Sequence, residues 1–213
     1  MRNFKVLSYL CTAAFLFMGC GSDETITVKD GKPEITDVMG ASRKIQENME
    51  SYQSKREERI KKGDTLSMHY KDLEKYLPEI AGFEKKRAPK GEIINMPGYG
   101  GWSKTELDYK GSEGEIEIEL TDYNQSANGF TIAAAVFGMN VQVENDREKS
   151  GSFDTGIPEV KGYEKVIKKS GRITLFYAIS DRFFLEIDGR GGVNAETLKK
   201  AANSMPLAEL AGM

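Results

Sequence analysis

The sequence predicts an α+β fold in which an antiparallel β-sheet of about five strands packs with helices, preceded by a cleaved signal peptide and a tether. Three observations predict this class. Apolar and polar residues alternate over residues 103–110 and 115–120, which is the pattern of a sheet with one solvated face. The alternation returns in three segments between residues 163 and 188. Helical patterns occur before, between and after these strands.

The composition is that of one globular domain. The chain has 213 residues, of which 39% are hydrophobic and 30% are charged, and its formal net charge is −3. This length allows a hydrophobic core of its own. The acidic balance, without a basic stripe that contains aromatic residues, argues against nucleic acid as a partner.

Residues 1–19 have the layout of a secretory signal peptide. Arg2 and Lys5 form a basic flank, residues 6–18 are uncharged and mostly apolar, and Gly19 is a small residue at the predicted cleavage site. The apolar run is shorter than the ~20 residues that a membrane-spanning helix needs. We therefore expect this segment to be removed.

The end of the signal resembles the lipobox of bacterial lipoproteins. Gly19 and Cys20 match that motif, whereas Phe17 and Met18 stand where leucine and a small residue are usual. The resemblance implies cleavage before Cys20, diacylglycerol on its sulfur and acylation of the new amine, so that Cys20 holds the protein on the membrane. No aspartate follows Cys20, which by analogy with Gram-negative lipoproteins implies the outer membrane. The alternative is an ordinary signal peptide with an incidental cysteine.

The two cysteines leave the mature chain without thiol chemistry. Cys11 lies inside the predicted signal, and acylation would block Cys20. We therefore expect no disulfide and no cysteine-ligated metal.

Residues 20–37 are predicted as a lipidated tether. The segment is polar and contains Gly31 and Pro33, which is typical of a linker. Within it, residues 25–28 are a candidate edge strand.

Residues 38–63 are predicted as an amphipathic helix that ends at Gly63, a typical C-cap. The helical spacing is carried by Ile45, Met49, Tyr52 and Ile60. Because this stripe is narrow, two interpretations stay open: docking on the core, or presentation to a partner helix.

Residues 64–213 are predicted as the α+β globular domain. It begins with a short helix over residues 66–77, which Pro78 ends, and continues with a charged loop over residues 84–90. Residues 111–114 then turn the chain between the two alternating segments, so that they form a hairpin.

The second half of this domain mixes one buried segment with more sheet. Residues 124–143 carry no charge and are predicted as a buried helix across the sheet, with a buried strand as the alternative. A polar loop is predicted over residues 144–156. The remaining strands are predicted over residues 163–169, 172–179 and 182–188.

A final helix is predicted from the N-cap Asn194 to about Ser204. The order of three strands and a helix over residues 160–210 resembles, in pattern alone, PsbP-like and LolA-like envelope domains. That resemblance implies the fold class and no specific activity.

The chain offers few side chains for catalysis. His69 is the one histidine, so neither a histidine-based metal site nor a Ser-His-Asp set is expected, and we predict no catalytic residue, metal or cofactor. Glu115, Glu117 and Glu119 share a strand face, with Asp122 after them, and could form a carboxylate pair, but alternating glutamate more often keeps a strand soluble. Residues 189–192 are predicted as a strand-to-helix turn rather than an anion site.

Tyr99 and Trp102 lie in a glycine-rich segment. They are the predicted partner contacts, because such rings often anchor ligands. The alternative is that the two rings fold back onto the core. The sequence thus predicts a lipid-anchored envelope protein that acts as a non-catalytic binding module for a protein or small ligand. The alternatives are a carrier of a small amphiphile in a groove between sheet and helices, and a carboxylate-dependent hydrolase of envelope polymers.

Overall fold

The computed structural model describes residues 25–29, 32–36, 38–97, 100–134, 137 and 142–213. The strands are β1 (Thr25–Lys29), β2 (Lys32–Thr36), β3 (Phe83–Lys85), β4 (Lys90–Met96), β5 (Gly100–Gly111), β6 (Gly114–Asp122), β7 (Gln142–Glu144), β8 (Glu148–Asp154), β9 (Val160–Ile167), β10 (Arg172–Ile179) and β11 (Phe183–Arg190). The helices are α1 (Val38–Lys61), α2 (Tyr70–Leu73), the 3₁₀ turn η1 (Glu74–Tyr76), α3 (Ala127–Ala133), α5 (Ala195–Asn203) and α6 (Leu207–Ala211).

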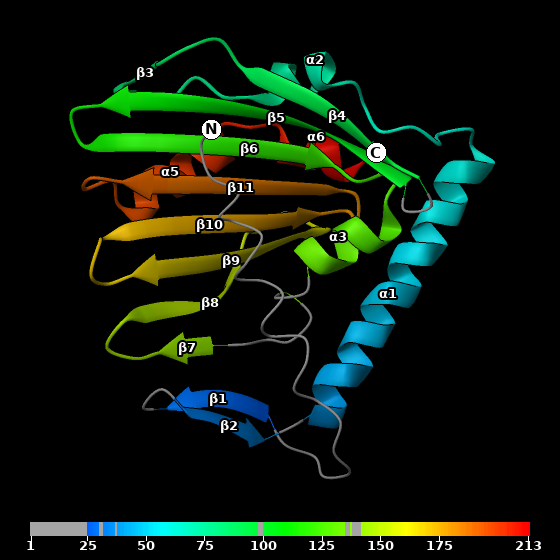
Figure 1. Cartoon of the computed structure of the whole chain (residues 1–213), viewed down its shortest axis with the longest axis horizontal. Helices are drawn as coiled ribbons and strands as arrows, with labels where there is room; N and C mark the ends of the chain where they lie inside the picture. The colour runs from blue at the N-terminus through cyan, green and yellow to red at the C-terminus, as the bar shows by residue number, and fades with distance from the viewer. Residues whose placement is uncertain (1–24, 30–31, 37, 98–99, 135–136, 138–141) are drawn as a thin grey trace.

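One mostly antiparallel sheet dominates the molecule (Figure 1). Its order is β2-β1-β7-β8-β9-β10-β11-β6-β5-β3, and β4 also pairs with β5. Strands β3–β11 form a nine-stranded sheet, and the β1–β2 hairpin extends it through a parallel pairing with β7. The predicted α+β class is confirmed, but the predicted number of about five strands is wrong.

The hairpin and the three later strands lie where the alternation predicts them, as β5, β6, β9, β10 and β11. Strands β3 and β4 occupy and follow the predicted loop at residues 84–90, and β7 and β8 occupy the predicted loop at residues 144–156. These segments are charged or rich in serine and glycine, so they show no apolar alternation. They form strands because pairing with neighbours supplies their hydrogen bonds: β3 and β4 pair with β5, β8 pairs with β9, and β7 pairs with β8.

The main core lies between the sheet and helices α2, α5 and α6. Every second side chain of β5, β6, β10 and β11 points into it, and many of these side chains are fully buried. The sheet side is represented by Leu107, Ile118, Leu120, Leu175, Leu185 and Ile187, and the helix side by Leu73, Leu198, Ala202 and Leu210. Each such large side chain stabilises the fold by about 1.5–3 kcal/mol.

The helices on this face differ in how well the pattern predicts them. The predicted N-cap Asn194 is confirmed, since its side chain accepts a hydrogen bond from the Thr197 N–H. The predicted helix at residues 66–77 shortens to α2 and η1, and His69 caps α2 by accepting a hydrogen bond from the Lys71 N–H. Helix α6 was not predicted.

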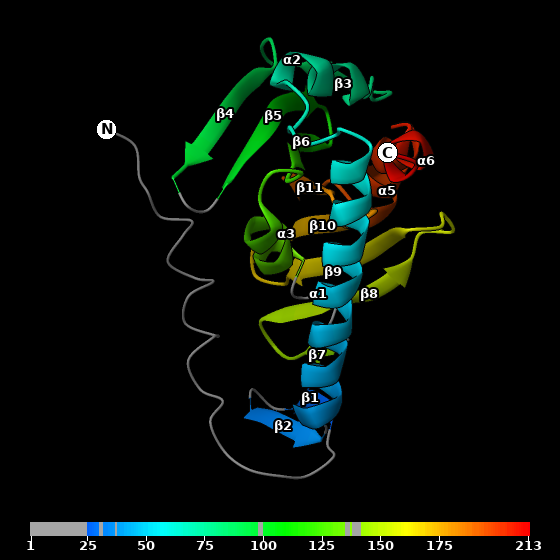
Figure 2. The ribbon, with the colours of Figure 1, turned by 90° about the vertical axis from the view of Figure 1, so that its right-hand side faces the viewer.

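Two helices lie away from the main core (Figure 2). Helix α3, within the predicted helix at residues 124–143, packs over one end of the opposite face through Phe130, which clusters with Tyr52 and Ala178. Helix α1 runs along the ends of the strands. Among the described residues, no helix is both long and apolar enough to span a bilayer.

The predicted apolar stripe of α1 does not explain how this helix docks. Tyr52 is 2% exposed, but Met49 and Ile60 are 39% and 42% exposed. The side chain of Ile45 lies outside what the structure describes. Besides Tyr52, helix α1 docks through polar side chains, among them Arg56 and Arg59, which donate to Asn124.

Candidate functional site

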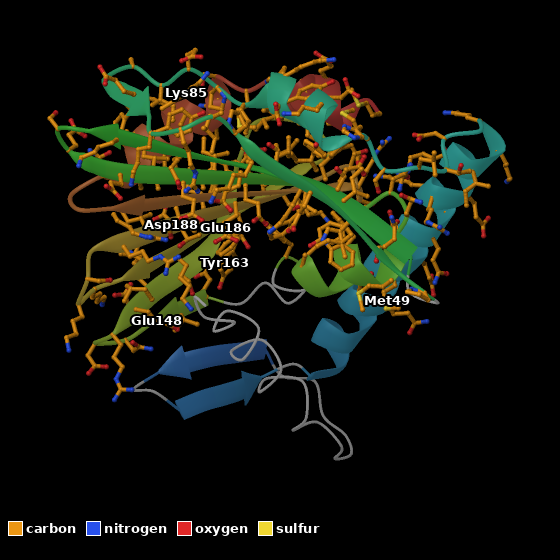
Figure 3. All side chains as sticks on the ribbon, turned by 45° about the horizontal axis from the view of Figure 1, so that its top comes forward. Met49, Lys85, Glu148, Tyr163, Glu186 and Asp188 are labelled. Atoms are coloured by element: carbon orange, nitrogen blue, oxygen red, sulfur yellow. The ribbon has the colours of Figure 1, made fainter. Side chains whose placement is uncertain are left out.

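The face of the sheet opposite α5 and α6 is the candidate site. We call it the open face; it carries the side chains of β5, β6, β9, β10 and β11 that alternate with the core residues. Figure 3 shows Glu186, Asp188 and Tyr163 on this face. Helix α3 covers one end of it, and the rest carries charged side chains together with aromatic rings.

Carboxylates from three adjacent strands form two rows on the open face. In one row Glu119 of β6 lies opposite Glu106 of β5 and Glu186 of β11. In the next row Glu117 lies between Asp108 and Asp188. Directly opposite residues in an antiparallel sheet have Cβ atoms about 4.5–5.5 Å apart, so these six carboxyl groups form one acidic block.

Basic side chains compensate five members of this block. Lys104 Nζ lies 3.0 Å from Glu119 Oε2, and Arg87 Nη2 lies 2.6 Å from Glu106 and 2.5 Å from Asp108. The Asp188 carboxylate is buried and ion-paired with both Arg172 and Arg190. Burial opposes the charged form of Lys104, but Glu119 and Glu92 outweigh it and raise the pKa of Lys104.

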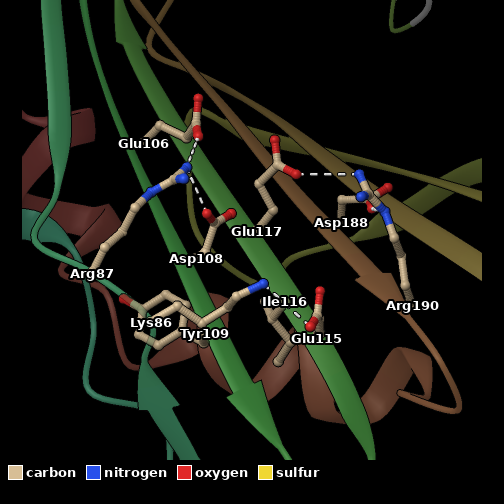
Figure 4. A pocket seen from close by; sticks show the side chains of 10 residues that line it. All are labelled: Lys86, Arg87, Glu106, Asp108, Tyr109, Glu115, Ile116, Glu117, Asp188 and Arg190. Atoms are coloured by element: carbon tan, nitrogen blue, oxygen red, sulfur yellow. Dashed lines mark hydrogen bonds and ion pairs between the residues drawn. The ribbon is translucent and has the colours of Figure 1, made fainter. Parts of the chain in front are cut away.

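A shallow pocket of about 330 Å³ lies at the edge of the acidic block (Figure 4). Arg87 and Arg190 reach over it from opposite sides, and Glu117 lies between them, 3.2 Å from Arg190 Nη2. Burial raises the pKa of Glu117, and the Arg190 charge opposes this effect. The pocket offers both hydrogen-bond donors and acceptors, which suits a polar ligand.

Glu186 is the carboxyl group of the block that has no direct partner among the described residues, although the charge of Arg172 partly offsets the effects that raise its pKa. It makes no ion pair or hydrogen bond with the described residues, although all five other members of the acidic block do. Burial, followed by the charges of Glu119 and Asp188, raises the pKa of Glu186 to about 7. Near neutral pH this carboxyl can therefore either donate a hydrogen bond or accept one.

Aromatic rings lie beside Glu186 on the open face. Phe176 of β10 is opposite Glu186, and its ring centroid is 6.0 Å from that of Phe184, two residues before Glu186 on β11. Phe137 lies 6.3 Å from Phe184. We call these three half-buried rings the aromatic row. Glu186 thus lies at the boundary between carboxylates and rings, where a ligand with polar and apolar parts can contact both.

Glu186 lies opposite Glu119 in the sheet, as the members of a carboxyl pair would. The pKa of Glu186 is raised, and Glu119 forms an ion pair with Lys104. Environments that push the pKa values of two neighbouring carboxyls apart are the basis of glycosidase chemistry.

Of the predicted lipidation site and partner contacts, the structure describes one residue, Trp102. Cys20 and Tyr99 lie outside the described residues. Trp102 is half-buried on the open face, with its ring 6.1 Å from that of Tyr123. It therefore folds back onto the domain while it keeps an exposed edge.

The candidate carboxylates separate into two groups. Glu115, Glu117 and Glu119 share the open face, as predicted. Asp122 points to the other side and is fully buried: its carboxylate pairs with Arg182, at 2.8 Å, and accepts hydrogen bonds from the backbone of Met68 and Asn124. Asp122 is therefore a structural residue.

The glycines at residues 189–192 form the predicted strand-to-helix turn. Gly191 and Gly192 have φ values of 84° and 129°, which favour glycine. A Cβ at Gly189 would lie 3.0 Å from Leu198, so this glycine lets α5 approach the sheet. Within the described ranges, no group of three or more His, Cys, Asp or Glu side chains could hold a metal ion.

Glu186, Asp188 and the aromatic row were not predicted as site residues. One sequence signal was available, since Phe184, Glu186 and Asp188 alternate with the core residues of β11 and must share its other face. The neighbours of that face, Glu119 and Phe176, depend on strand order, which the alternation does not reveal.

Comparisons with known proteins add little. No family model matches the chain, and no curated protein matches it in sequence. A solved X-ray structure of an uncharacterised protein from Mycobacterium smegmatis, an Rv0999 ortholog, is similar over 59% of this chain and 90% of its own length, with 8% sequence identity and a TM-score of 0.32. A likeness at this TM-score carries no argument about the fold or the function.

Proposed function

We propose that this chain is a lipid-anchored cell-envelope protein that acts as a non-catalytic binding module, with its ligand on the open face. The observation that carries the binding role is the Glu186 carboxyl beside the aromatic row, which has no ion pair or hydrogen bond with the described residues. A carboxyl group that is partly withdrawn from water without a partner costs free energy, and a ligand that supplies a donor or a cation would recover it. The adjacent rings would contact the apolar part of that ligand.

The anchor is supported by the signal layout of residues 1–19 and by Gly19 and Cys20 of the lipobox. Residues 20–37 would then form the lipidated tether, although β1 and β2 give most of it a folded form. Acyl chains on Cys20 would hold the protein at the outer membrane, since each buried CH₂ group contributes about 0.8 kcal/mol. Metabolic labelling with a fatty-acid analogue tests this: we expect label on the native protein and none on Cys20→Ser, and equal labelling would refute the anchor.

The binding role is tested by recovery from crosslinked membranes. The native chain is compared with Glu186→Gln and with Glu196→Gln, a control on the exposed side of α5. We expect one reproducible protein or small molecule with the native chain and the control, and at least tenfold less with Glu186→Gln. Recovery of nothing reproducible, or equal recovery with all three proteins, would contradict the role.

A second candidate is the carboxylate-dependent hydrolase of envelope polymers, favoured by the opposed pair Glu186 and Glu119. In that role Glu186 is the general acid and Glu119 the base or nucleophile. Purified envelope polysaccharide would be cleaved by the native chain and not by Glu186→Gln or Glu119→Gln. No cleavage by the native chain would eliminate this candidate.

The carrier alternative receives less support. A carrier needs an open groove between sheet and helices, but the interface with α5 and α6 is filled by fully buried side chains such as Leu175 and Leu198. Native mass spectrometry of the purified chain would reveal a retained amphiphile.

A further inference from the structure

Helix α1 is attached to the domain by a small, mostly polar contact. Its tertiary hydrogen bonds and ion pairs come from Ser51, Lys55, Arg56 and Arg59. Tyr52 supplies the main apolar contact, stacked on Phe130 with ring centroids 5.5 Å apart. Among the described residues, the buried Tyr52 hydroxyl has no hydrogen-bond partner, which makes this contact less favourable than its area suggests.

Lys55 is the centre of the polar contact. Its ammonium group bonds to the Glu159 carboxylate and lies 3.3 Å from Asp181 Oδ2. Ser51 Oγ donates a second hydrogen bond to the same Asp181 oxygen. We call these four residues the latch.

The body side of the latch is built on left-handed backbone. Glu159, Ser180 and Asp181 have φ values of 62°, 48° and 54°. The backbone N–H of Ser180 donates to the Glu159 carbonyl, which joins the two loops. Ser180 and Asp181 form a two-residue hairpin turn, a position in which Asn-Gly is preferred. A positive φ is also uncommon for a glutamate such as Glu159. Side chains held at unfavourable φ values point to a role for those side chains.

The domain beneath α1 does not need the helix to satisfy its buried charges. Arg182 pairs with Asp122 and also with Asp64, at 2.7 Å. Around this network, removal of α1 takes away the donors from Arg56 and Arg59 to Asn124, whereas its other bonds, from Ser51, Lys55 and Arg59, go to Glu159 and Asp181. The buried network therefore survives without the helix.

A hinge lies at the C-terminal end of α1. Gly63 has a φ of 82°, and a Cβ at this position would have no atom within 4 Å. The N–H of Gly63 donates to the Ile60 carbonyl and that of Asp64 to the Arg59 carbonyl, so rotation at this point requires these two capping bonds to break. Glycine itself permits a wide range of backbone angles. Helix α1, Gly63 and the latch thus lie in one stretch of chain and in the two loops that α1 contacts.

We propose that α1 is a hinged strap that opens at Gly63 when the latch of Lys55, Ser51, Glu159 and Asp181 releases. The opening takes the β1–β2 hairpin away from β7, while strands β3–β11 stay folded. Opening uncovers Phe130 and the part of α3 that lies beside the aromatic row. The inference stands apart from the proposed function, because neither the anchor nor the ligand enters it.

Hydrogen exchange of the full-length chain in detergent tests the strap. The native chain, Lys55→Met and the control Lys61→Met, an exposed lysine one turn and a half further along α1, are compared at low and high salt. We expect amides of residues 45–61 to exchange about tenfold faster in Lys55→Met, and faster at high salt in the native chain, because exposed ion pairs are screened. Exchange in β5, β6, β10 and β11 should stay unchanged, as should α1 in the control.

Asp181→Gly separates the latch from general stability. It removes the carboxylate that Lys55 and Ser51 share, and it places glycine where the turn prefers it. We expect faster exchange in α1 together with equal or slower exchange in the sheet. Unchanged α1 exchange in both variants, or acceleration of α1 and the sheet together, would overturn the proposal.

Discussion

Arg182 is the side chain whose loss should damage the fold most. Its side chain is 5% exposed, and it donates three hydrogen bonds to the fully buried Asp122 and one to Asp64. Burial opposes the charge of Arg182, but the two carboxylates outweigh it and raise the pKa of the guanidinium. The substitution Arg182→Met keeps a long side chain but leaves the Asp122 carboxylate buried without a counter-charge.

The expected cost follows from the burial of this pair. Removal of one partner of a buried ion pair costs about 3–5 kcal/mol, because the remaining charge is uncompensated. The backbone donors of Met68 and Asn124 still contact Asp122, so we expect the lower half of that range. At about 2–4 °C per kcal/mol for a domain of this size, the midpoint of thermal unfolding should fall by on the order of 6–15 °C.

Urea unfolding followed by the fluorescence of Trp102, the one tryptophan, measures this loss. A double-mutant cycle with Asp122→Asn gives the sharper test. Asp122→Asn should destabilise the native chain, yet stabilise Arg182→Met by removing the buried charge. A loss below about 1 kcal/mol for Arg182→Met, or the same sign for Asp122→Asn in both backgrounds, would refute this reasoning.

Three further predictions test other parts of the structure. Because the pKa of Glu186 is raised to about 7, its neutral form favours the fold at low pH, and this stability is lost as pH rises from about 4.3 through 7. Glu186→Gln should therefore stabilise the protein by about 1–3 kcal/mol at pH 8 and flatten its stability–pH curve in calorimetry. An unchanged curve would contradict this prediction. Gly114 has a φ of 142°, and a Cβ there would lie 2.0 Å from the Arg190 carbonyl oxygen. Gly114→Ala should therefore lower the free energy of unfolding, measured in urea, by about 2 kcal/mol or more. The control Gly171→Ala, where a Cβ would have open space around it, should lower it less. Tyr109 Oη donates to the Pro78 carbonyl at 2.7 Å, so Tyr109→Phe should cost about 1 kcal/mol, and no measurable loss in the same assay would show that this bond contributes nothing.

The sequence pattern predicts strands well only where one face is apolar. Ile116, Ile118 and Leu120 alternate with glutamate, and β6 lies where that alternation predicts it. Strand β8 has no such alternation; it is held by pairing with β9 and by surface contacts such as Lys165 with Glu148. Partners supplied from elsewhere in the chain leave no local pattern.

The candidate site shows the same limit. The glutamates of β6 could be assigned to one face, but the pKa of Glu186 depends on Glu119 and Asp188 as neighbours and on burial. Asp122 looks like a member of the glutamate series in the sequence. Its structural role becomes visible only when Arg182, 60 residues away, lies against it.

Binding of the ligand to the open face is tested most directly in intact cells, with a photoreactive amino acid placed at Phe184 in the aromatic row and, separately, at Glu196 on α5. We expect a discrete crosslinked product from position 184 that is absent from position 196. Equal products from both positions, or a product from position 196 alone, would contradict it.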